Sequence, residues 1–315
     1  MSFSGMVKEE LSRQTSTARH CRIAETAALL SACGRITKDG SLRFQTENDA
    51  VVRKYFTLLQ KTFNIDTEIA IRESSLLKKG NVYHIEITDP LQVQNVLQGT
   101  KLSVNEADRG TLFPENGLIT QQNCCKRAFI RGAFLASGSI SDPEKGYHFE
   151  IVCQDEAKAE NLRDIIHTFQ IDAKIVLRKK SYVVYVKEGA QIVDMLAVME
   201  ANVALMDLEN IRILKEMRNT VNRKVNCEAA NINKTVNAAV RQVEDIQLIS
   251  RTIGFESLSD GLAQIARLRL QYPDATLKEL GMMLNPQVGK SGVNHRLRKL
   301  SEIADELREN KEELL

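Results

Sequence analysis

The amino-acid sequence predicts an α+β protein in which an αββαββα unit occurs twice and is followed by an all-helical domain. Three observations lead to this prediction: an internal repeat, alternating apolar residues after the first helix of each copy, and purely helical patterning beyond about residue 205. The repeat relates residues 24–87 to residues 128–187. A length of 315 residues also fits two or more domains better than one.

Small residues spaced four apart anchor the repeat. They are Ala24, Ala28 and Ala32 in one copy, and Ala128, Gly132 and Ala136 in the other. Such a stripe leaves one helix face almost without side chains. We therefore expect the helices at 22–33 and 126–137 to pack on each other about a pseudo-twofold axis, with two four-stranded sheets side by side. The alternative is that the alanines only favour helix formation, but Gly132 costs about 1 kcal/mol in mid-helix and so needs a packing reason.

Each copy continues in the same order after this first helix. Gly34 and Gly138 follow the helices, and we expect both to adopt the left-handed conformation that often ends a helix. Period-two alternation then predicts strands, and apolar spacings of three and four predict helices. The strands are expected near 42–44, 69–71, 83–87, 149–153, 175–177 and 182–186, and the helices near 52–63, 90–98, 162–169 and 189–200.

A basic, asparagine-rich stretch begins the C-terminal third. Between Arg212 and Arg241 there are seven basic residues and two acids. Arginine and asparagine side chains suit contacts with phosphates and base edges, although a solvated helix between domains explains the composition equally well. The candidates for additional DNA contacts here are Arg218, Asn222, Arg223, Asn226, Asn231 and Lys234.

Three further helices predict a helix-turn-helix domain. Thr276 and Glu279 form a capping-box signature, after which Leu277, Leu280, Met283 and Leu284 should face inward. Ser291 is expected to cap the third helix, whose outward residues are basic or amide-bearing, as a recognition helix requires. Any small helical bundle can show a similar pattern. The candidate DNA-binding residues are Thr276, Lys290, Ser291, Asn294, His295, Arg296, Arg298 and Lys299.

The composition gives no overall argument for a nucleic-acid or membrane partner, since 43 basic and 41 acidic residues leave a net charge of +2. No apolar run approaches the roughly 18 residues that cross a bilayer. The first ten residues also lack the pattern of a signal peptide. A cytoplasmic protein without a membrane partner is therefore expected.

The six cysteines show no C-x-x-C spacing. A zinc site at His20 and Cys21 would need two more ligands at ligand spacing, and the sequence shows none. The adjacent Cys124 and Cys125 could form a redox pair, but reduced cytosolic cysteines usually serve as small apolar residues. We therefore predict no metal ion and no cofactor.

The segment Ile130-Arg131-Gly132-Ala133-Phe134-Leu135-Ala136-Ser137-Gly138 resembles the nine-residue LAGLIDADG motif of homing endonucleases, and residues 26–34 resemble a weaker copy. The resemblance implies that the αββαββα repeats form a pseudo-dimer. In active members, the residue before the last glycine is an acid that binds a divalent metal ion. Cys33 and Ser137 stand at these positions, and a thiol and a hydroxyl are poor ligands for Mg²⁺. Glu25 lies at the wrong end of its helix to replace them.

A degenerate LAGLIDADG repeat followed by a helix-turn-helix is similar to the WhiA family of bacterial sporulation and cell-division regulators. The likeness spans nearly the whole chain, including residues 2–11, 222–231, 276–281 and 289–296. It implies a nucleoid-associated, DNA-binding protein with roles in transcription, cell division, sporulation and chromosome segregation.

The domains are expected at residues 1–122 and 123–206 for the two repeats, 207–256 for a basic helical linker, and 257–315 for the helix-turn-helix. The main hypothesis is a non-enzymatic regulator that binds double-stranded DNA. The repeat domain would be an inactive scaffold that touches DNA or holds a protein partner, and a basic rim for DNA is expected at Lys78, Lys79, Arg178, Lys179 and Lys180. The alternatives are a metal-dependent endonuclease with atypical ligands and a protein-docking adaptor.

Overall fold

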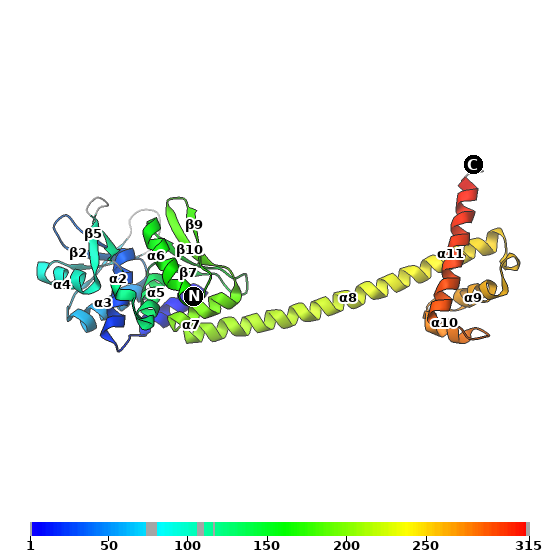
Figure 1. Cartoon of the computed structure of the whole chain (residues 1–315), viewed down its shortest axis with the longest axis horizontal. Coiled ribbons are helices and arrows are strands. Elements are labelled where there is room, and N and C mark those ends of the chain that lie inside the picture. Colours follow the sequence, from blue (N-terminus) through cyan, green and yellow to red (C-terminus); the bar gives the residue numbers. More distant parts are fainter. Residues whose placement is uncertain (1, 74–80, 106–109, 116, 313–315) are drawn as a thin grey trace. The chain divides into compact units, whose positions relative to one another are not determined.

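The computed structural model describes residues 2–73, 81–105, 110–115 and 117–312 (Figure 1). The chain divides into two compact units, Met1–Glu216 and Met217–Leu315. The first unit mixes helices and sheets, and the second is helical in its described residues. The predicted α+β class is therefore confirmed.

The αββαββα order is confirmed in both copies. The first copy consists of α2 (Arg19–Cys33), β1 (Gly34–Ile36), β2 (Leu42–Thr46), α3 (Asp49–Phe63), β3 (Ile69–Glu73), β4 (Asn81–Ile87) and α4 (Pro90–Thr100). The second consists of α5 (Asn123–Ser137), β7 (Gly138–Ile140), β8 (Phe149–Cys153), α6 (Glu156–His167), β9 (Lys174–Arg178), β10 (Ser181–Val186) and α7 (Gly189–Met199). Both first helices begin three residues earlier than expected.

The expectation of two four-stranded sheets is wrong for the first copy. Its sheet has six strands in the order β3-β4-β2-β1-β6-β5, whereas the second sheet has four, in the order β7-β8-β10-β9. The extra strands, β5 (Leu102–Asn105) and β6 (Thr111–Pro114), come from the connector between the copies. They pair with each other, and Thr111 pairs with Arg35, so the hairpin covers the edge that β1 would otherwise leave open.

Helix α1 (Phe3–Arg13) was not expected from the sequence. It buries Phe3, Val7 and Leu11, which are spaced four apart and form one helix face. The Ser2 hydroxyl accepts a hydrogen bond from the Gly5 amide and caps the helix. These residues belong to the core of the first unit.

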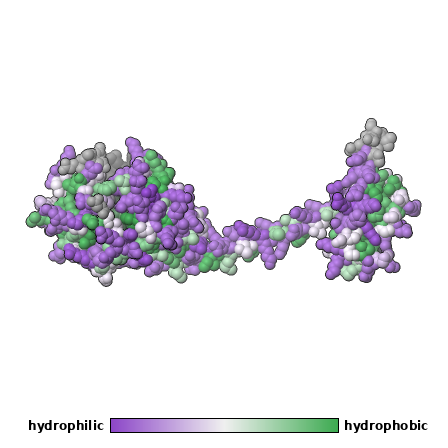
Figure 2. All heavy atoms as spheres, in the orientation of Figure 1, coloured by the Kyte–Doolittle hydropathy of each residue, from purple (hydrophilic) through white to green (hydrophobic). Residues whose placement is uncertain are grey.

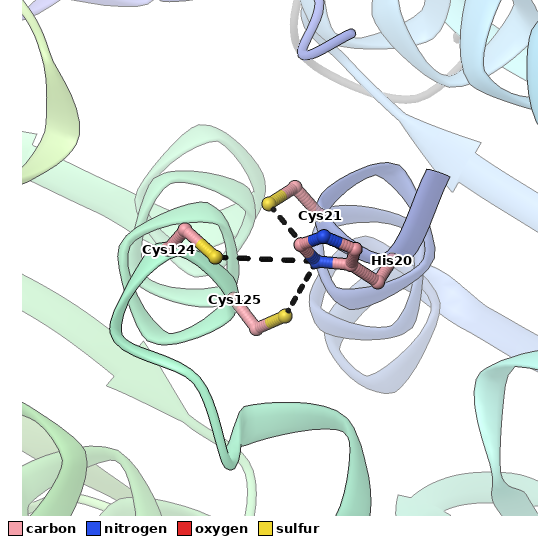
Figure 3. Close-up of side chains that lie close together, drawn as sticks. All are labelled: His20, Cys21, Cys124 and Cys125. Atoms are coloured by element: carbon pink, nitrogen blue, oxygen red, sulfur yellow. Dashed lines mark hydrogen bonds between the residues drawn. The ribbon is translucent and has the colours of Figure 1, made fainter. Parts of the chain in front are cut away.

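The small-residue stripes bring α2 and α5 into close contact, as expected. A Cβ atom at Gly132 would lie 2.6 Å from the Glu25 carbonyl oxygen and 2.9 Å from the Ala28 Cβ. No side chain larger than hydrogen fits at that point without a shift of one backbone against the other. The two helices therefore form the centre of the first unit, with their N-terminal turns side by side (Figure 3).

The expected left-handed conformation at Gly34 and Gly138 is wrong. Both residues are extended, with φ angles of −95° and −81°. Glycine is needed here for space, because a Cβ atom would lie 2.6 Å from the Leu30 carbonyl oxygen at Gly34 and 2.2 Å from the Phe134 ring at Gly138. The chain can thus turn from helix directly into strand, which leaves Cys33 and Ser137 at that corner.

The second unit has its own hydrophobic core. It contains the C-terminal part of α8 (Asn202–Thr252), together with α9 (Asp260–Gln271), α10 (Leu277–Met283) and α11 (Lys290–Glu312). Short 3₁₀ turns lie at Leu118–Thr120 in the first unit and at Phe255–Ser257 in the second. None of the described helices is long and apolar enough to cross a membrane.

The capping box at Thr276 and Glu279 is confirmed, since each side chain accepts a hydrogen bond from the other residue's backbone amide. Two details of the prediction are wrong. Helix α11 begins at Lys290, so Ser291 lies within its first turn and does not cap it. Met283 is 45% exposed, because α10 ends at this residue and its side chain falls outside the buried face.

Candidate nucleic-acid interface and degenerate nuclease site

The exposed face of α11 is the strongest candidate nucleic-acid interface. Val293, Leu297 and Leu300 are buried, so the helix presents its opposite face to solvent. Asn294, His295, Arg298 and Lys299 lie on that exposed face, and Lys290 is exposed in the first turn. From residue 285 to residue 300 the chain has four basic residues and no acid.

The two arginines predicted to contact DNA from this helix, Arg296 and Arg298, are engaged within the protein. Arg296, which was expected to point outward, is half-buried, and its guanidinium donates a hydrogen bond of 3.4 Å to the Gly261 carbonyl oxygen. Arg298 is exposed and forms a 3.3 Å ion pair with Glu302 one turn further along. Lys290, His295 and Lys299 make no ion pair within the described residues, so their polar groups face solvent.

The remaining candidates of the domain differ in their roles. The Thr276 hydroxyl is exposed but belongs to the capping box, where it lies 2.8 Å from a Glu279 carboxylate oxygen. The backbone and hydroxyl of Thr276 hold the pKa of Glu279 below its usual range. Ser291 is exposed in the first turn of α11. Ser291 thus lies at the N-terminus of a long helix, where a phosphate can bind, whereas the Thr276 hydroxyl is engaged by the Glu279 carboxylate.

Helix α8 exposes all the basic and amide residues that the sequence singled out. These residues are Arg218, Asn222, Arg223, Asn226, Asn231 and Lys234. The apolar residues Val221, Val225 and Ile232 between them, and Val236 just beyond, are each more than half exposed. Figure 2 shows hydrophilic and hydrophobic residues interleaved along this helix. Both kinds of side chain are therefore available to a partner.

The basic rim of the repeat domain is only partly described. Lys179 and Lys180 are exposed in the turn between β9 and β10, where Lys179 has a left-handed φ of 58°. Arg178 is paired with Glu150 at 2.9 Å, which offsets its charge. Lys78 and Lys79 lie outside the described residues.

The degenerate position Cys33 ends α2 beside a lysine. Lys8 and Cys33 line one open groove together with Glu47 and Asp49. Burial raises the pKa of the Cys33 thiol to about 11, and the Lys8 ammonium opposes that rise. A neutral thiol beside an ammonium group is unfavourable for a divalent cation. Asp49 is paired with Arg53 at 3.1 Å.

The second degenerate position, Ser137, ends α5 in a groove without an acid. The Ser137 hydroxyl donates a 2.8 Å hydrogen bond to the Val152 carbonyl oxygen. Lys158 lines the same groove and donates a 3.0 Å hydrogen bond to the Ser31 carbonyl oxygen. Each position that carries a metal-binding acid in active endonucleases therefore has a nearby lysine here.

Glu25 is buried and held by two cations. Its carboxylate lies 3.0 Å from both the Lys54 ammonium and the Arg131 guanidinium, and Arg131 also contacts Glu200 at 2.7 Å. Burial would lower the pKa of Arg131, but the charges of Glu25 and Glu200 raise it above its usual range. Glu25 thus joins α2, α3 and α5, and is not available as a ligand at the other end of α2.

A cluster that sequence spacing missed lies at the N-terminal turns of α2 and α5. The Nδ1 atom of His20 lies 3.1 Å from the Cys125 sulfur, 3.4 Å from the Cys21 sulfur and 3.9 Å from the Cys124 sulfur (Figure 3). Burial is the main cause that raises the pKa of Cys21, and it raises the pKa of Cys125 to about 12. The two further side chains near His20 and Cys21 come from the other repeat, so spacing along the sequence did not reveal them.

Three family models match successive parts of the chain. They describe a WhiA N-terminal LAGLIDADG-like domain at residues 19–103, a WhiA LAGLIDADG-like domain at residues 126–218 and a WhiA C-terminal HTH domain at residues 221–304. The matches bear out the resemblance of both repeats and of the helical C-terminal region.

Relatives match over the full length of the chain. A protein of Lachnoclostridium phytofermentans named "Probable cell division protein WhiA" is 59% identical over 98% of this chain and 100% of its own. One of the same name from Alkaliphilus oremlandii is 50% identical over 99% of both chains. The crystal structure of full-length DUF199/WhiA from Thermatoga maritima covers 97% of this chain and 99% of its own, with 25% identity and a TM-score of 0.61. From repeats to helix-turn-helix, the chain belongs to the WhiA family.

Proposed function

We propose that this protein is a sequence-specific regulator that binds double-stranded DNA through the exposed face of α11. The observation that carries the proposal is the group of exposed polar side chains on this face, Lys290, Asn294, His295 and Lys299, opposite a well-packed core. Amide and basic side chains on one helix face can read base edges and bind phosphates in a major groove. Arg298 joins them when DNA phosphates compete with Glu302.

The family supports a role in cell division, since its curated relatives carry that name. We extend the proposal to control of transcription during sporulation and chromosome segregation, with the protein at the nucleoid in the cytoplasm. For this function we propose four parts of the chain. The two repeats span residues 1–122 and 123–206, a basic helical linker spans 207–256, and the DNA-binding domain spans 257–315.

In this proposal the repeat domain is a scaffold without nuclease activity. Cys33 and Ser137 lack carboxylates. The Cys33 groove holds Lys8 together with the acids Glu47 and Asp49, and the Ser137 groove holds Lys158 and no acid. The scaffold contributes to DNA binding through Lys179 and Lys180 or holds a protein partner. The exposed residues Arg218, Asn222, Arg223, Asn226, Asn231 and Lys234 of α8 add contacts with the DNA backbone.

The test first uses the full-length protein to select the duplexes that it binds from genomic fragments. The affinity for these duplexes is then measured at several salt concentrations. Replacing His295 and Lys299 together with alanine should weaken binding and reduce sequence discrimination, because both side chains lie on the exposed face of α11. Lys61→Ala is the matched control, since Lys61 is exposed on α3, a helix that packs on the sheet. Unchanged affinity in the double variant would contradict the recognition role and leave α11 as a protein-docking helix.

The contribution of the repeat domain is tested separately by replacing Lys179 and Lys180 with glutamate. Each lost phosphate contact should reduce the slope of log affinity against log salt by about 0.9. An unchanged slope would show that these lysines do not contact the DNA.

The DNA-binding samples, incubated with Mg²⁺ or Mn²⁺, should contain only intact DNA. Nicking that a chelator abolishes would contradict the inactive scaffold and favour an endonuclease with atypical ligands.

A further inference from the structure

Four side chains of types that bind transition metals, one imidazole and three thiols, converge where the two repeats meet. One ligand atom each from His20, Cys21, Cys124 and Cys125 lies within 4.8 Å of every other (Figure 3). Cys21 and Cys125 are buried, whereas His20 and Cys124 are exposed, so an ion could enter from one side. Among the described residues this is the one group of three or more histidine, cysteine and acidic side chains close enough to share an ion.

The spacing of these atoms fits a single tetrahedral ion. Zinc–sulfur distances of about 2.3 Å and zinc–nitrogen distances of about 2.0–2.1 Å give tetrahedral edges of roughly 3.6 Å from nitrogen to sulfur and roughly 3.8 Å between sulfurs. The three distances from His20 Nδ1 to the sulfurs are 3.1, 3.4 and 3.9 Å. Shifts of about 1 Å or less would therefore complete the coordination sphere.

The pseudo-twofold axis explains why the ligands meet. Cys124 follows His20 by 104 residues, which is also the shift of the repeat, so the two residues occupy equivalent positions on α5 and α2. Cys21 and Cys125 are equivalent in the same way. Gly132 lets the two helices approach closely, and each contributes two ligands from its first turn. Neither helix has a side-chain hydrogen bond at its N-cap.

We propose that His20, Cys21, Cys124 and Cys125 bind one Zn²⁺ ion that joins the N-terminal turns of α2 and α5. Three thiolates and one imidazole favour zinc over magnesium or calcium, which prefer oxygen ligands. Four protein ligands fill a tetrahedral sphere and leave no position for a catalytic water, so the ion is structural. It lies at the opposite ends of these helices from Cys33 and Ser137 and does not restore the nuclease site.

The test uses the full-length chain, purified with a thiol reductant and without chelator after expression in zinc-supplemented medium. Elemental analysis should find about one zinc ion per chain. Cobalt substituted for zinc should give the ligand-field bands of tetrahedral Co²⁺ and a thiolate charge-transfer band. Cys125→Ser should lose most of the zinc, whereas the matched control Cys227→Ser, at an exposed cysteine of α8, should keep it.

A second variant keeps the test decisive if Cys125→Ser does not fold. Cys124 is exposed, so Cys124→Ser should preserve the fold, judged by circular dichroism, and still lower zinc content and the thermal midpoint of the holoprotein. Folded wild-type protein that retains no zinc after exposure to it would overturn the proposal. A folded Cys124→Ser variant with unchanged zinc content would overturn it as well.

Discussion

At the scale of single residues, the contact between α2 and α5 depends on one missing side chain. A Cβ atom at Gly132 would lie 2.6 Å from the Glu25 carbonyl oxygen, which is too close for any real contact. The buried ion pairs of Glu25 with Lys54 and Arg131 lie at the same crossing, so a shift of the helices would also disturb them. The pairs specify how the helices are placed, because any unpaired member would be a buried charge.

We therefore expect Gly132→Ala to lower the free energy of unfolding by about 1–3 kcal/mol, although alanine is the better helix former. Urea denaturation of the variant and of the wild type measures this difference. Gly146→Ala is the matched control, because a Cβ atom there would meet nothing within 4 Å. A Gly132→Ala protein as stable as the wild type would show that the helices can separate without cost.

At the scale of elements, apolar periodicity predicted most helices and strands because it records which face is buried. It missed α1, although Phe3, Val7 and Leu11 carry the same periodicity, and it missed β5 and β6, which are short and lie in a connector. The role of Gly34 was also misread. A glycine that follows a helix can adopt a left-handed conformation, or it can be needed because a Cβ atom would clash with a neighbour. At Gly34 the clash with the Leu30 carbonyl oxygen shows that the second reason applies.

The candidate sites could be predicted to different extents. The face of α11 could be read from the sequence, because burial of Val293 and Leu297 fixes which residues face solvent. The inward contact of Arg296 could not be predicted from the sequence, since it depends on Gly261 in another helix. The cysteine–histidine cluster was missed because its ligands are two adjacent pairs on separate helices. The equivalence of His20 and Cys124 in the repeat was the available signal.

The capping box of α10 gives a prediction for an element. Thr276→Ala should lower the free energy of unfolding by about 0.5–2 kcal/mol, because the amide of Glu279 loses its hydrogen-bond acceptor. Thr276→Ser keeps the hydroxyl and should retain most of that stability, as chemical denaturation would measure. Equal losses in both variants would mean that the methyl group of Thr276, and not the cap, stabilises this turn.

At the scale of the whole molecule, two hydrophobic cores lie in two units, and α8 is the continuous helix that carries the chain from one to the other. The central residues of α8 from 218 to 238 are exposed, so few buried contacts there can couple the unfolding of the units. The second core is held to α8 partly through the buried Asp245, whose carboxylate accepts hydrogen bonds from Ser301 and Arg308.

The units should therefore unfold as separate transitions, and a core substitution in one should leave the other unchanged. Leu297 is 1% exposed at the centre of the second core, and Leu297→Ala should destabilise that unit by about 2–5 kcal/mol. Calorimetry of the full chain should show two transitions, of which only one moves to lower temperature in Leu297→Ala. The transition that stays in place belongs to Met1–Glu216, and the Gly132→Ala variant identifies it because that substitution shifts it. A common shift of both transitions in Leu297→Ala would show that α8 transmits stability between the two cores.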